Sequence, residues 1–91
     1  MTKLESIKCE KLMEEAIQKV KQANDEYAES EMQCNNEVAR QVSLRKADQH
    51  YGEAIGINQA LVILGFKHDR MKELEELLYY GRRKKEKMFL F

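Results

Sequence analysis

Residues 61–69, Leu-Val-Ile-Leu-Gly-Phe-Lys-His-Asp, carry the clearest fold signal in the chain. An apolar run ends at Gly65, the residue type that most readily adopts the left-handed conformation found just after a helix. Phe66 is then predicted to fold back onto Leu61, the apolar contact that accompanies this kind of helix end. The stretch predicts the end of one helix and, at Asp69, the N-cap of the next.

Upstream of this end, apolar side chains recur at helical steps back to Val38, which predicts a helix over about residues 36–64. Asn35 and Asn36 precede it, and asparagine side chains compete with the backbone for hydrogen bonds. A turn is therefore predicted there, with Asn36 capping the second helix. One unbroken helix through the asparagines is the alternative, because neither glycine nor proline interrupts the segment.

The segment before the asparagines predicts a helix over about residues 3–33. Its apolar side chains form one stripe at helical spacing: Met13, Ala16, Val20, Ala23 and Tyr27. Two long helices of matched length favour an antiparallel hairpin. A short third helix is predicted over about residues 69–80, followed by a basic and apolar C-terminal tail at residues 82–91. We expect one all-α domain over residues 1–91, assembled into an oligomeric helical bundle.

The composition agrees with an all-α class. The 91 residues include no proline and only 4 glycines, and residues of high helix propensity dominate. Sixteen basic and 16 acidic residues cancel, so no overall field attracts nucleic acid or anionic lipid. No apolar run approaches the roughly 20 residues that span a bilayer. We expect a cytoplasmic protein without membrane contact, and its two cysteines, Cys9 and Cys34, to be reduced.

No arrangement of residues predicts catalysis or a metal centre. A metal needs three or four converging ligands, and Cys9, Cys34, His50 and His68 show no such spacing. His50 is interpreted as a solvated helical residue and His68 as a polar residue of a turn. Neither a phosphate-binding glycine loop nor a nucleophile with its base is present. We expect no enzyme activity, no catalytic residue, no metal and no cofactor.

Two glycines within the second helix, Gly52 and Gly56, mark a candidate contact face together with Ala54 and Ala60. Each glycine costs about 1 kcal/mol relative to alanine inside a helix, so a compensating interaction is expected. One interpretation is that another helix approaches this face closely, either from the same chain or from a second copy. The other is that the glycines leave a groove for a partner.

The C-terminal residues form a second candidate contact segment. Four basic residues come first, Arg82, Arg83, Lys84 and Lys85, and four apolar ones end the chain: Met88, Phe89, Leu90 and Phe91. Apolar side chains at a chain end are predicted to dock against a neighbouring subunit or a partner. The basic run could instead contact phosphates, although no aromatic residues for base stacking are interleaved with it, so nucleic-acid binding is not favoured.

From Tyr51-Gly52-Glu53-Ala54 through Gln59 to Phe66, the chain resembles the second helix of small helical-hairpin accessory proteins of Gram-positive bacteria and their phages. The resemblance implies a non-catalytic protein-binding module, acting as an oligomer, and an inhibitor of a host defence protein in some cases. A small nucleic-acid-binding regulator that uses the basic C-terminal segment, or a phage assembly or chaperone subunit, is the alternative. The partner itself is not predicted.

Overall fold

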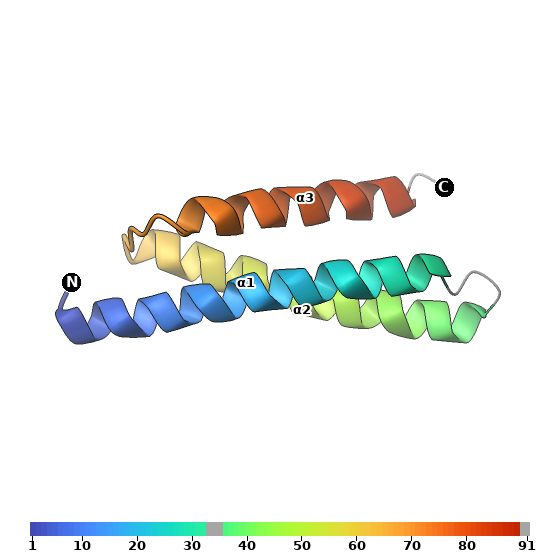
Figure 1. Ribbon diagram of the computed structural model, residues 1–91, viewed down its shortest axis with the longest axis horizontal. Helices are drawn as coiled ribbons and strands as arrows, with labels where there is room; N and C mark the ends of the chain where they lie inside the picture. The colour runs from blue at the N-terminus through green and yellow to red at the C-terminus, as the bar shows by residue number, and fades with distance from the viewer. Residues whose placement is uncertain (33–35, 90–91) are drawn as a thin grey trace.

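The computed structural model describes residues 1–32 and 36–89, and side chains as far as residue 80. Three helices follow one another in this part of the chain: α1 (Lys3–Met32), α2 (Glu37–Ile63) and α3 (Met71–Phe89). α1 and α2 run antiparallel, and α3 returns along them, which gives an elongated molecule of 52 × 20 × 16 Å (Figure 1). The predicted all-α class and helical hairpin are confirmed.

Polar contacts between α1 and α2 show the antiparallel register. Tyr27 donates a hydrogen bond to Asp48, 21 residues away, whereas Lys19 reaches Glu53, 34 residues away. The separation in sequence grows with distance from the turn, as it must in a hairpin. The apolar stripe predicted for the first helix lies between the helices, because the side chains named for it, from Met13 to Tyr27, are all buried.

The reversal between α1 and α2 takes place between Met32 and Glu37, which excludes one continuous helix. Asn36 has an extended backbone (φ −130°), and its side-chain oxygen accepts a hydrogen bond from the Ala39 amide at 3.1 Å. This bond satisfies one of the amide groups that have no partner at the start of a helix. The predicted N-cap is confirmed, while Asn35 lies outside the described residues.

The helix end at Gly65 has the predicted geometry. Gly65 has a φ of 74°, and its amide donates to the Val62 carbonyl at 3.0 Å. The Phe66 amide donates to the Leu61 carbonyl, also at 3.0 Å. These two bonds define a Schellman motif, in which the left-handed residue lets the chain turn back on the helix. Phe66 and Leu61 are both buried in the same apolar cluster.

The start of α3 differs from the prediction, because the helix begins at Met71 and Asp69 does not cap it. The imidazole of His68 accepts a hydrogen bond from the Arg70 amide at its Nδ1, at 3.1 Å, and the His68 carbonyl accepts one from Met71. The ring also stacks on Phe66, with the centroids 5.9 Å apart. His68 is therefore a residue of the turn, as predicted, and its ring and carbonyl accept hydrogen bonds from the Arg70 and Met71 amides at the start of α3.

α3 is also longer than predicted. It comprises 19 residues and continues to Phe89, so residues 82–89 are helical rather than a separate tail. Arginine, lysine, glutamate and methionine all have high helix propensity, and Gly81 alone does not stop a helix. Leu90 and Phe91 lie outside the described residues.

α3 is held to the hairpin by a small set of contacts. Met71, Leu74 and Leu78 are buried against α1 and α2. The hydroxyl of Tyr51 on α2 donates to the Leu78 carbonyl at 2.8 Å.

Between the helices, Cys9 is a buried free thiol, while Cys34 lies outside the described residues. None of the helices described here combines the length and apolar character needed to cross a membrane.

Candidate functional site

The side of α2 that faces away from the core carries a continuous line of exposed positions. They are spaced alternately by four and three residues, the repeat that keeps positions along one side of a helix. We call this set the outer stripe: Val38, Val42, Arg45, Gln49, Gly52, Gly56, Gln59 and Ile63. At its two ends, Val38 is 76% and Ile63 is 84% exposed, although both are large aliphatic residues.

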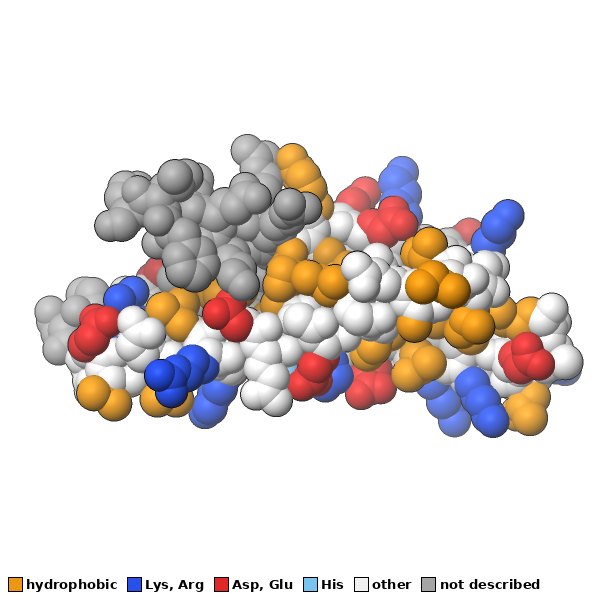
Figure 2. All heavy atoms as spheres, turned by 180° about the vertical axis from the view of Figure 1, so that it is seen from behind, with side chains coloured by type: hydrophobic (Ala, Val, Ile, Leu, Met, Phe, Trp, Pro, Cys, Tyr) orange, Lys and Arg blue, Asp and Glu red, His pale blue; other side chains and the backbone are white. Residues whose placement is uncertain are grey.

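The opposite side of α2 faces the core. Ala47, Tyr51, Ala54 and Leu61 are buried there against the other helices. α2 thus has apolar residues on two opposite sides, a pattern expected of a helix that is covered on both. Figure 2 views the molecule from behind, where α2 lies, and the middle of its right half is orange and white, with charged side chains mostly above and below.

The structure divides the four residues of the predicted glycine and alanine face. Ala54 is buried in the core, whereas Gly52, Gly56 and Ala60 are exposed. A Cβ built on Gly52 or Gly56 would meet no atom of the described chain within 4 Å. Within the described residues, no helix of the same chain crosses closely over these glycines, so this part of the chain supplies no internal contact for them. Their helix-propensity cost, about 1 kcal/mol each, is not offset within the described chain.

The N-terminal part of the outer stripe is hollowed. A depression of about 260 Å³ is lined by Glu37, Val38, Gln41, Val42 and Arg45. The carboxylate of Glu37 accepts hydrogen bonds from the side chains of Arg40 and Gln41, which lower its pKa to about 2. Glu37 is therefore ionised at neutral pH beside two exposed valines, which gives the depression an apolar base and a charged rim.

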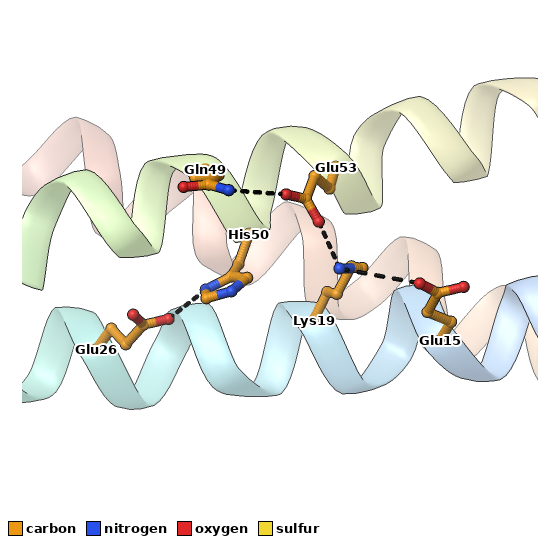
Figure 3. Close-up of polar contacts among 6 residues, drawn as sticks. All are labelled: Glu15, Lys19, Glu26, Gln49, His50 and Glu53. Carbon is orange, nitrogen blue, oxygen red and sulfur yellow. Dashed lines mark hydrogen bonds and ion pairs between the residues drawn. The ribbon is translucent and has the colours of Figure 1, made fainter.

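One edge of the outer stripe is fixed to α1 by ionic contacts (Figure 3). The Lys19 ammonium pairs with the Glu53 carboxylate, and Glu15 lies 3.9 Å from the same ammonium. The Glu53 carboxylate also accepts a hydrogen bond from Gln49 at 3.2 Å. The bond to Lys19 lowers the pKa of Glu53, and the bond to Glu53 raises the pKa of Lys19. These contacts position Gln49 of the outer stripe.

A second polar contact joins the helices closer to the turn. The His50 Nδ1 lies 2.5 Å from a carboxylate oxygen of Glu26, and the Glu26 side chain is only 10% exposed (Figure 3). The interpretation of His50 as a solvated residue is wrong, because its ring bridges to the neighbouring helix. Sequence reasoning missed this pair, although the position of Glu26 next to the apolar stripe of α1 was a usable signal.

Two exposed cations lie at the middle of α2. Among the described residues, Arg45 and Lys46 form no ion pair, whereas the nearby acids Glu37 and Glu53 both have partners. An unpaired cation on an otherwise uncharged stripe can form an interaction with a partner at little desolvation cost, because it sits at the surface.

The predicted C-terminal contact residues fall in or beyond the last part of α3. The backbone of Arg82, Arg83, Lys84, Lys85, Met88 and Phe89 is helical. Their side chains, together with all of Leu90 and Phe91, lie outside the described residues. Their docking against a subunit or partner stays a prediction.

Within the described side chains, no group of three histidine, cysteine, aspartate or glutamate residues could hold a metal ion.

Neither a protein-family model, nor a curated protein, nor a solved structure matches the chain. The candidate surface is therefore defined by its own geometry: a full-length, exposed and nearly uncharged stripe on a helix whose other side forms the core.

Proposed function

We propose that this protein is a non-catalytic protein-binding module and that the outer stripe of α2 is its contact surface. The observation that carries the proposal is the stripe itself. Its ends carry the exposed side chains of Val38 and Ile63, and its centre carries two glycines with open space above them. Val38 lies beside the exposed Val42, and Ile63 beside the exposed Val62 and Leu64, so each end of the stripe carries a group of exposed aliphatic side chains of the kind that marks contact surfaces.

A helix is the partner element that fits best. The alternating four- and three-residue spacing is the repeat by which one helix packs along another. Gly52 and Gly56 let a second backbone or a long side chain approach the α2 backbone closely. The other side of α2 is packed in the core, so the stripe is already formed and little backbone entropy is lost on binding.

The narrower hypothesis, inhibition of a host defence protein by a phage protein, stays a prediction that rests on the sequence resemblance. Binding through the outer stripe is compatible with it, because an inhibitor of this size acts by covering a surface of its target. A cytoplasmic location likewise stays a prediction.

Capture from a bacterial lysate with matched variants tests the proposal. Val38→Lys and Ile63→Lys place charges on the outer stripe at exposed positions, where they leave the fold intact. Gln22→Leu is the control, because Gln22 is an exposed residue of α1 and is not part of the outer stripe. We expect specific proteins to be retained by the wild type and by Gln22→Leu and to be lost with both lysine variants. Equal retention by all four proteins would refute a contact surface on α2.

A further inference from the structure

The outer stripe is complementary to itself when it is reversed. Arg45 and Gln49 are long side chains four residues apart, and Gly52 and Gly56 are two positions without side chains, also four residues apart. A two-fold axis midway between Gln49 and Gly52 places each long side chain of one copy opposite a glycine of the other. This arrangement would explain the two glycines, for which the described part of the single chain supplies no packing contact.

The same register extends over the whole helix. It places Val38 opposite the second copy's Ile63, so that the two most exposed aliphatic residues of the stripe cover each other at both ends. Val42 lies opposite the second copy's Gln59, next to its Ala60. All positions of the stripe gain a partner, and none projects beyond the end of the other copy.

The charges distinguish an antiparallel from a parallel pair. In a parallel pair each residue of the seam faces its own copy, so Arg45 would face Arg45, and Asp48 would lie beside the second copy's Glu53. Both contacts bring like charges together. In the antiparallel pair Arg45 lies over a glycine, and Lys46 comes within two residues of the position opposite Glu53, on the same edge of the stripe.

The contact area indicates a reversible dimer. The stripe spans 25 helical steps of about 1.5 Å, or about 37 Å, and a helix presents a face about 10 Å wide, so each copy covers about 370 Å². A standard stable interface covers about 800 Å² on each partner. Half of that area lies below the range of stable interfaces, so we expect a weak dimer in rapid exchange with the monomer.

We infer that a second copy of this chain occupies the outer stripe as an antiparallel partner of α2. Arg45 of each copy lies over the second copy's Gly56, and Gln49 lies over its Gly52. This inference rests on the proposed function and names its partner. It also gives the module a means of control, because a foreign helix must compete with the second copy for the same surface.

Sedimentation equilibrium over micromolar to millimolar concentrations measures the association. Gly56→Leu is the decisive variant: no described atom surrounds this position in the single chain, so the monomer folds, but the leucine fills the space that Arg45 needs in the dimer. Overpacking of this kind should raise the dissociation constant about 5- to 150-fold. Gln22→Leu, which adds the same side chain off the stripe, should leave it unchanged.

Cysteine cross-linking tests the orientation. In a Cys34→Ser background, with Cys9 buried, Val42→Cys and Gln59→Cys each place one thiol on the stripe. Mixed together, the two variants should form a disulfide-linked heterodimer, whereas Val42→Cys alone should not, because its two thiols would lie about 25 Å apart along the helices. Cross-linking of Val42→Cys with itself would show a parallel pair and overturn the inference.

The two proposals fail in different ways. A wild-type protein that stays monomeric to millimolar concentration overturns the second-copy inference, while lysate proteins lost with Val38→Lys still support a contact surface on α2. A dimer whose dissociation constant is the same in Gly56→Leu and Gln22→Leu also overturns the inference. If the stripe variants change neither self-association nor capture, both proposals are refuted.

Discussion

Replacing glycine by alanine within α2 and just after its end should change the stability in opposite directions. Gly56 lies within α2 with open space around it, so its substitution gains helix propensity without a steric cost. The gain is about 0.8–1.0 kcal/mol. Gly65 has a φ of 74° at the end of the helix, where open space does not help, because the left-handed backbone itself disfavours a Cβ. Alanine there costs about 1–2 kcal/mol.

The assay is urea unfolding followed by circular dichroism, at concentrations too low for self-association. The difference between the two variants, about 2–3 kcal/mol, is the sum of the two effects and is well above the error of the method. In thermal unfolding each kcal/mol corresponds to a shift of about 4–8 °C for a domain of this size. Gly52→Ala is the internal control and should match Gly56→Ala. If Gly56→Ala and Gly65→Ala destabilise the protein equally, the open surroundings of Gly56 or the left-handed cap would be wrong.

Three further substitutions test individual contacts. Asn36→Ala removes the N-cap of α2 and should lower the free energy of unfolding by about 1 kcal/mol in urea titrations, whereas an unchanged midpoint would contradict the capping role. His50→Ala leaves the Glu26 carboxylate without its partner between the helices, at a cost of about 1–3 kcal/mol, and a double-mutant cycle with Glu26→Ala should show a coupling energy, since strictly additive losses would mean that the pair does not interact. The folded-state pKa of Glu37 is about 2, below its ordinary value of 4.5, so its stabilising effect is complete above pH 4.5 and is lost as the pH falls toward 2. In Glu37→Gln the unfolding midpoint should depend less on pH in that window. If the midpoints of the two proteins change equally with pH, this assignment is refuted.

The two ends of α2 could be predicted from the sequence because they depend on local interactions. Asn36 and Gly65 could be assigned because each acts within a few residues of itself, one through a side-chain hydrogen bond and the other through its backbone freedom. Asp69 failed for a related reason. Two neighbouring polar residues could each satisfy the amide groups before α3, and the imidazole of His68, which stacks on Phe66 two residues earlier, accepts the hydrogen bond from Arg70.

The candidate surface was only half predictable. The unusual glycines, Gly52 and Gly56, identified α2 as the helix with an unexplained cost, which the structure supports. The sequence does not predict whether these glycines face the core or the solvent, because α2 has apolar residues on both sides and its periodicity does not show which side meets α1. Ala54 was therefore grouped with the glycines although it lies in the core. The pairing of Glu26 with His50 depends on the register of the hairpin, which the sequence leaves open.

The two-sided character of α2 also bears on how the chain avoids misfolding. α1 could in principle bury its apolar stripe against either side of α2, and two nearly equal packings would leave the protein without a unique structure. Glu26 removes this ambiguity, because on the correct side its buried carboxylate meets His50, and on the outer stripe it would meet Gln49 and glycine instead. An unpaired buried carboxylate is heavily penalised, so the wrong hairpin is rejected even where its hydrophobic contacts are adequate. We therefore expect the pair to influence which hairpin forms, in addition to how stable that hairpin is.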